Sequence, residues 1–183
     1  MPGLELYAVT GRPVGHSLSP ELFGLLFGYF ERNAVYTRLA ADSSREALET
    51  ARAIGLRGLN VTSPFKETVV SLLDDVSDEA ARIGAVNCLR LDGLGRASGY
   101  NTDFIGLIKT LKNKDASPRG RRVLVLGTGG AARAAAFGLL RAGAARVILA
   151  GRSIERARRA ARSLGSEAGR LEEIGKIDRK SVV

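Results

Sequence analysis

Apolar and polar residues follow two spacings that alternate along the chain. Short apolar runs rich in Val, Ile and Leu are typical of buried strands, and an apolar residue every three or four positions is typical of helices. The strand-like segments are 4–10, 34–40, 58–62, 85–91, 96–99, 122–126 and 146–150. The helix-like segments are 19–32, 44–54, 66–73, 78–83, 102–111, 131–141 and 154–164. This alternation predicts an α/β fold.

The apolar pattern stops once, in a polar stretch at 112–120 that contains a proline and a glycine. Such a stretch is typical of a linker. We therefore predict two domains, residues 1–113 and 121–183, joined by a linker at 114–120.

Composition limits the class of protein. The chain has 183 residues, 45% of them hydrophobic and 26% charged, as in ordinary globular proteins. The single Cys88 excludes a disulfide framework within the chain and fits a reducing compartment. No apolar run is long enough to cross a membrane, and the N-terminus lacks the residue order of a secretory signal. We expect a cytoplasmic protein that binds no membrane.

The net charge of +9 suggests nucleic acid as a partner. The excess is confined to the C-terminal third, where residues 119–183 hold 15 Lys or Arg against 5 Asp or Glu. Residues 1–118 are almost neutral, with 13 against 14. We therefore expect a small anionic ligand for the basic part, and no nucleic acid.

A glycine cluster, Gly127-Thr-Gly129-Gly130, lies between a predicted buried strand and a predicted alanine-rich helix. This is the context in which a dinucleotide binds, because the glycines let the backbone approach a pyrophosphate at the start of the helix. The alternative is a glycine-rich turn without a ligand. The strand and helix on either side favour the nucleotide.

The end of the next predicted strand indicates which dinucleotide. NAD sites place an acidic residue there for the ribose 2′-hydroxyl. This strand ends instead in Gly151-Arg152-Ser153, with Arg156 one helical turn further. Guanidinium groups form paired hydrogen bonds with phosphate oxygens, so the sequence favours NADP. The alternative is that these arginines are merely solvated, as we expect for Arg158, Arg159 and Arg162.

Polar side chains collect in three stretches of the first predicted domain, around residues 16–20, 60–66 and 84–103. They follow predicted strands, and polar groups at the carboxyl ends of strands meet ligands in α/β proteins. Hydroxyls, amides, an ammonium and a carboxylate suit a polyhydroxylated anion. Each also has a local explanation; Ser19, for example, followed by Pro20, is expected to be a helix N-cap.

The segments that carry these features resemble shikimate dehydrogenases. They are GRPVGHSLSP, LNVTSPFKE, GAVNCL, GYNTDFIGL and VLGTGGAARA, in the family's order and spacing between about residues 6 and 165. The resemblance implies an N-terminal α/β substrate domain followed by a Rossmann-type NADP-binding domain. It also implies the reversible, NADPH-dependent reduction of 3-dehydroshikimate to shikimate, in the pathway to the aromatic amino acids.

The resemblance further implies a role for each matching residue, and no metal ion. The substrate carboxylate would be held by Ser17 and Ser19, and the ring hydroxyls by Asn60, Thr62 and Asn87. The catalytic pair would be Lys66 and Asp103, with Lys66 donating or accepting the proton at the reacting oxygen. The pyrophosphate would lie on Gly127, Gly129, Gly130 and Ala131, and the 2′-phosphate on Arg152, Ser153 and Arg156.

The chain departs from the family in two respects. The family usually has Asn where Gly151 stands, which we expect to weaken an adenosine contact without changing the cofactor. The family is also longer, so we expect an incomplete Rossmann-type domain. The chain is then either part of a working shikimate dehydrogenase or a non-catalytic remnant that binds substrate or nucleotide. Quinate is an alternative substrate, and the sequence does not indicate an oligomeric state.

Overall fold

The computed structural model describes residues 3–172 and forms two compact units. The first extends to Ala80 and also contains Ala85–Tyr100. The second contains Ala81–Gly84 and the chain from Asn101 onward. This division precedes the helix at Asp103–Asn113, whereas the predicted linker at 114–120 follows it; the domain boundary at that linker stays a prediction.

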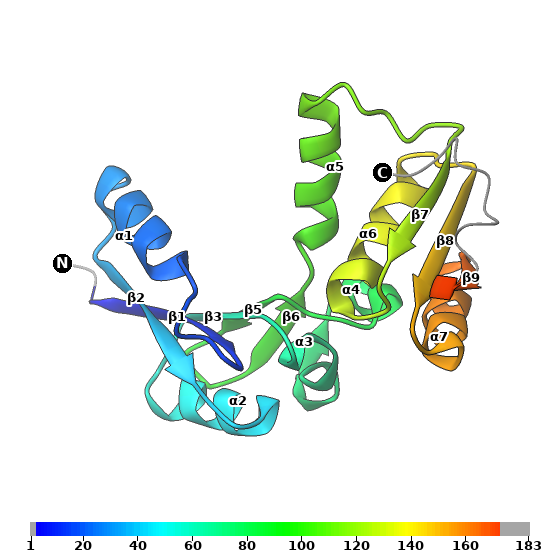
Figure 1. The fold of residues 1–183 in the computed structure, drawn as a ribbon. Coiled ribbons are helices and arrows are strands. Elements are labelled where there is room, and N and C mark those ends of the chain that lie inside the picture. The colour runs from blue at the N-terminus through cyan, green and yellow to red at the C-terminus, as the bar shows by residue number, and fades with distance from the viewer. Residues whose placement is uncertain (1–2, 173–183) are drawn as a thin grey trace. The chain divides into compact units, whose positions relative to one another are not determined.

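The first unit is built on a six-stranded mixed sheet in the order β2-β1-β3-β5-β6-β4 (Figure 1). The central strand β1 runs parallel to both neighbours, β2 and β3. The hairpin predicted between residues 85 and 99 is confirmed, since β5 and β6 are antiparallel neighbours. The strands are β1 (Glu5–Gly11), β2 (Ala34–Ala40), β3 (Gly58–Val61), β4 (Asp75–Val76), β5 (Cys88–Leu91) and β6 (Ala97–Tyr100).

Helices α1 and α2 pack on opposite faces of this sheet because successive residues of β1 face opposite ways (Figure 1). Ala8 belongs to the larger core cluster with α2, whereas Val9 belongs to a smaller cluster beside α1. Ser43 caps α2 by accepting a hydrogen bond from the backbone N–H of Glu46 at 3.1 Å. The helical segments of this part of the chain are α1 (Ser19–Tyr29), α2 (Ser44–Ala53), α3 (Phe65–Thr68), a 3-10 turn η1 (Val70–Leu72) and α4 (Asp78–Ile83).

Two predictions about these helices are wrong. The single helix predicted at 66–73 is instead the short α3 followed by η1. The break lies at Val69 and Val70, where two β-branched residues in a row disfavour a continuous helix. The predicted N-cap is displaced by one residue: Leu18 occupies that position without a side-chain cap, and Ser19 is the first helical residue.

The second unit contains three parallel strands in the order β7-β8-β9. The β7-α6-β8-α7-β9 succession places each helix between two neighbouring parallel strands, as in a Rossmann-type fold. The α/β fold class is thereby confirmed, with α7 at the predicted residues. The elements are α5 (Asp103–Asn113), β7 (Arg122–Leu126), α6 (Gly130–Arg141), β8 (Arg146–Gly151), α7 (Ile154–Leu164) and β9 (Glu167–Arg170).

Alanine lets α6 and α7 pack closely on the strands. Ala134 and Ala157 are fully buried, and Phe137 packs edge-on against Phe104 of α5 with ring centroids 5.1 Å apart. Among residues 3–172, no helix is long and apolar enough to cross a membrane, and no group of three or more acidic, Cys or His side chains could hold a metal ion.

Candidate functional site

The loop that follows β1 brings the two predicted carboxylate-binding serines together. The Ser17 hydroxyl donates to the Ser19 hydroxyl at 3.2 Å, and the Ser17 oxygen also accepts the backbone N–H of Ser19 at 3.3 Å. Ser17, rather than Ser19, therefore satisfies a free N–H at the start of α1. Ser19 is the first residue of α1 and Ser17 lies two residues before it, so both hydroxyls lie beside a helix start, where N–H groups favour a bound anion.

Arg38 of β2 fixes the backbone of this loop. Its guanidinium donates from Nε and Nη2 to the carbonyl oxygen of Ser17, at 3.0 and 2.5 Å. The same group pairs with the Glu21 carboxylate at 2.7 Å, which lowers the pKa of Glu21. Sequence reasoning missed Arg38, because only the pairing of β2 with β1 brings it beside the loop.

The end of β3 carries the predicted amide and hydroxyl ligands. The Asn60 side chain donates from Nδ2 to the carbonyl oxygen of Asn87 at 3.3 Å, while its Oδ1 accepts the hydroxyl of Tyr36 at 2.6 Å. The backbone N–H of Thr62 donates to the Thr10 carbonyl at 2.8 Å, which holds Thr62 beside the end of β1. Burial is the main cause that raises the pKa of Tyr36, a residue that sequence reasoning also missed.

The predicted catalytic residues lie in different units. Lys66 is the second residue of α3, and its carbonyl oxygen accepts the N–H of Val86 at 2.8 Å, beside Asn87 in sequence. Asp103 begins α5, where its N–H donates to the Asn101 side chain at 3.1 Å. Asn101 is only 4% exposed, so the start of α5 is firmly anchored. Pairing of Lys66 with Asp103 stays a prediction.

The glycine cluster forms the predicted turn between β7 and α6. Gly127 adopts φ +126°, which favours glycine, and its N–H donates to the Ala150 carbonyl at 2.7 Å. Gly129 occupies the N-cap position without a side-chain cap, and Gly130 and Ala131 begin the helix. Uncapped N–H groups at a helix start suit a phosphate or pyrophosphate.

Gly151 ends β8 directly beside this turn. A Cβ added to Gly151 would lie 2.8 Å from Cγ2 of Thr128, closer than carbon atoms approach. The Thr128 side chain thus takes up the space that a side chain at position 151 would need. This contact accounts structurally for glycine at a position where the resembling family has asparagine.

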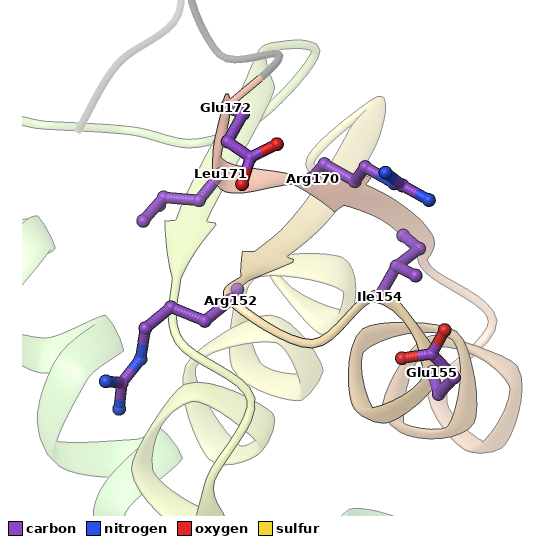
Figure 2. A pocket seen from close by; sticks show the side chains of 7 residues that line it. Arg152, Ile154, Glu155, Arg170, Leu171 and Glu172 are labelled. Carbon is purple, nitrogen blue, oxygen red and sulfur yellow. The ribbon is translucent and has the colours of Figure 1, made fainter.

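A pocket of about 310 Å³ opens at the ends of β8 and β9 (Figure 2). The side chains of Arg152 and Arg170 extend in different directions from its lining, and the Glu155 side chain lies near the start of α7 (Figure 2). Ser153 caps α7 by accepting the N–H of Arg156 at 3.3 Å, and its hydroxyl donates to Glu155 at 3.0 Å. The lining residues are Gly151, Arg152, Ile154, Glu155, Arg170, Leu171 and Glu172.

One predicted phosphate ligand, Arg152, therefore lines the pocket. Three further charged residues line it as well, and the sequence motifs did not indicate them: Glu155, Arg170 and Glu172. The most important of these charges is that of Glu155, because it is an acid close to the predicted 2′-phosphate site. A hydrogen bond with its own backbone, then the Ser153 hydroxyl, then Arg158 and Arg170, lower the pKa of Glu155. The lining does not include Arg156, which is exposed on α7.

Comparison with known proteins identifies both parts of the chain. Residues 9–89 match the model of the shikimate dehydrogenase substrate binding domain, and residues 109–183 match that of shikimate / quinate 5-dehydrogenase. The chain belongs to the shikimate dehydrogenase family. Both matches agree with the resemblance seen in the sequence motifs.

Curated proteins with similar sequences are also shikimate dehydrogenases. The NADP(+) shikimate dehydrogenase of Aquifex aeolicus is 44% identical over 155 residues, which are 84% of this chain and 57% of that protein. The enzyme of Syntrophobacter fumaroxidans is 47% identical over 159 residues, 87% of this chain and 54% of the relative. The chain thus spans little more than half the length of these two relatives.

Solved structures agree as well. The crystal structure of shikimate dehydrogenase from Aquifex aeolicus superimposes with a TM-score of 0.86 at 41% identity, covering 94% of this chain and 66% of that one. The Thermus thermophilus shikimate 5-dehydrogenase, solved in complex with NADP(H) and shikimate, gives a TM-score of 0.81 at 37% identity. That comparison covers 92% of this chain and 64% of the Thermus chain.

Proposed function

We propose that this shikimate dehydrogenase family chain takes part in the NADP-dependent interconversion of 3-dehydroshikimate and shikimate. The observation that carries the proposal is the hydrogen-bonded cluster in the first unit, in which Ser17 contacts Ser19 and Asn60 contacts both Tyr36 and the Asn87 carbonyl. This cluster joins hydroxyl groups suited to a carboxylate with amides suited to ring hydroxyls. Residues 9–89 match the model of the shikimate dehydrogenase substrate binding domain, which supports this function over a non-catalytic remnant that binds substrate or nucleotide.

In this proposal Ser17 and Ser19 hold the substrate carboxylate at the start of α1, where the helix dipole favours negative charge. The ring hydroxyls are bound by Asn60, Thr62 and Asn87. The short loop between β3 and α3 then brings Lys66 within the same neighbourhood. The substrate domain comprises residues 1–113 and the nucleotide domain 121–183, with a linker at 114–120.

The proposed reaction adds a hydride to the ketone carbon of 3-dehydroshikimate, and NADPH supplies that hydride when bound. Negative charge then develops on the ketone oxygen, where the Lys66 ammonium stabilises it and donates a proton. In this proposal Asp103 orients the ammonium. In the reverse direction Lys66 accepts the proton of the shikimate hydroxyl.

The residues of the second unit fit a dinucleotide. The positive φ of Gly127 and the uncapped start of α6 suit a pyrophosphate on Gly127, Gly129, Gly130 and Ala131. Arg152, Ser153 and Arg156 bind the 2′-phosphate in this proposal, although Ser153 already serves as the N-cap of α7. We propose a cytoplasmic location and no metal or nucleic acid as a partner.

Oxidation of shikimate by the purified chain, followed through the absorbance of the NADPH that forms, tests the proposal. Loss of a general acid typically costs about 10²–10⁴ in rate, so Lys66→Ala should lower turnover by roughly that factor. The exposed Lys109 of α5 supplies a matched control, and Lys109→Ala should leave the rate unchanged. Quinate, assayed beside shikimate, measures the preference between the two substrates.

Three outcomes distinguish the possibilities. Turnover that depends on Lys66 supports the proposal for this chain. Binding of shikimate and NADP without turnover supports the non-catalytic remnant. Full turnover by Lys66→Ala contradicts the catalytic assignment.

A further inference from the structure

Tyr36 is the one polar residue among the three buried members of the cluster beside α1, the other two being Val9 and Val14. It is 9% exposed and faces the side of the sheet covered by α1. Its ring stacks on Phe23, with centroids 4.4 Å apart and planes 2° from parallel. A phenylalanine would fill the same space, so packing alone does not account for the hydroxyl.

The partners of that hydroxyl settle the direction of each hydrogen bond. The Asn87 carbonyl only accepts, so Asn60 turns its Nδ2 toward it and its Oδ1 toward Tyr36. An amide oxygen also only accepts, so Tyr36 donates its single proton to Asn60. Toward Ser19, its other side-chain partner, the Tyr36 oxygen must therefore accept.

The same reasoning extends to Ser17. Ser19 uses its proton on Tyr36, so its oxygen accepts the proton of Ser17 across their 3.2 Å contact. The resulting chain of hydrogen bonds runs in one direction. Its members, in order, are Ser17, Ser19, Tyr36, Asn60 and the Asn87 carbonyl.

We propose that Tyr36 is a positioning residue of the proposed substrate site, which holds the Asn60 amide in one orientation. This inference rests on the proposed function, since it assigns shikimate to the site formed by Ser17, Ser19, Asn60, Thr62 and Asn87. With Oδ1 held by Tyr36 and one N–H held by Asn87, Asn60 presents its second N–H as a donor. It therefore favours a substrate hydroxyl that accepts.

Counting the protons shows that this orientation does not depend on the serine pair. A carboxylate only accepts, so it binds Ser17 and Ser19 by drawing their protons away from the chain. Tyr36 then loses the hydrogen bond from Ser19 but keeps its own proton on Asn60. The amide thus stays in one orientation whether or not the carboxylate end is occupied.

Tyr36→Phe tests the inference, because it removes only the hydroxyl. Calorimetric titration with shikimate should give a dissociation constant about three- to tenfold higher than that of the unaltered chain, the usual effect of one hydrogen bond. Tyr7 supplies a matched control, since it pairs with Tyr36 across β1 and β2 and its hydroxyl contacts Glu5 at 3.2 Å. Tyr7→Phe should leave shikimate affinity unchanged.

Because Tyr36 is proposed to act by orienting Asn60, two further results are expected. In an Asn60→Ala background, Tyr36→Phe should change shikimate affinity by less than twofold, because the residue that it positions is gone. In NMR spectra without ligand, Tyr36→Phe should shift the side-chain amide signals of Asn60, whereas Tyr7→Phe should not.

The outcomes separate this inference from the function on which it rests. An unaltered chain that fails to bind shikimate contradicts the proposed function, and the Asn60 amide signals still test the positioning. Normal shikimate affinity in Tyr36→Phe, or an equal loss with and without Asn60, overturns the inference alone. Unshifted Asn60 signals in Tyr36→Phe overturn it as well.

Discussion

Gly151 lies in contact with Thr128, so the effect of a substitution at position 151 on stability should depend strongly on the residue at position 128. In Gly151→Ala the new Cβ would lie 2.8 Å from Thr128 Cγ2, about 1 Å inside ordinary carbon contact. Forcing a methyl group into a packed site typically costs about 1–3 kcal/mol of unfolding free energy. For a unit of this length, that corresponds to a Tm lowered by about 4–24 °C.

Removing the Thr128 side chain should reverse the effect. In a Thr128→Ala background the nearest remaining side-chain atom, Cβ of residue 128, lies 3.9 Å from the added carbon, an ordinary contact. Gly151 also lies outside the left-handed region of φ, so alanine causes no backbone strain there. Gly151→Ala should then be neutral, or stabilise by about 0.4–1 kcal/mol by restricting the unfolded chain.

Thermal unfolding of the unaltered chain, of Gly151→Ala, of Thr128→Ala and of the double variant measures this dependence. Far-ultraviolet circular dichroism follows the unfolding. All four tyrosines lie in the first unit, so tyrosine fluorescence reports that unit separately and should not change. Gly106→Ala is a control, because its added carbon has no atom within 4 Å. The reasoning is refuted if Gly151→Ala lowers the Tm equally with Thr128 and with Ala at position 128.

Two other predictions concern charge. Arg152→Ala should raise the dissociation constant of NADP about tenfold or more and that of NAD little, because a guanidinium bond to phosphate is strong; Arg159→Ala is the control, and equal weakening of both cofactors contradicts the assignment. Asp74 accepts the Ala97 N–H at 2.7 Å and pairs with Arg52, and these contacts lower its pKa below 3.8. Asp74→Asn should therefore lower the Tm at neutral pH by an amount that shrinks as the pH falls through that lowered pKa, and a difference independent of pH contradicts this explanation.

The sequence predicted the parts of the fold that local patterns determine. The apolar, β-branched run before Gly127 and the basic amphipathic segment at 154–164 fold as predicted. The strand β9 was not predicted, because its sequence Glu-Ala-Gly-Arg has little strand preference of its own. It forms by pairing with β8, a tertiary contact that no local window contains.

The candidate site likewise contains residues that local motifs predict and residues that only tertiary contacts bring to it. Ser17, Asn60 and Asn87 were predicted because they lie in recognisable motifs. Tyr36 and Arg38 were missed, although their spacing of two places both on one face of a strand. Only the register of β2 against β1, and of β1 against β3, brings that face beside the serine loop and Asn60.

The central claim is that the first unit binds shikimate and the second binds NADP. Backbone NMR of the labelled chain, titrated first with shikimate and then with NADP⁺, tests it most directly. Shikimate should shift the signals of Ser17, Ser19, Asn60, Thr62 and Asn87, and NADP⁺ those of Gly127, Gly129, Gly130, Arg152 and Ser153. Unchanged spectra at millimolar ligand, or shikimate shifts confined to the second unit, would contradict the account.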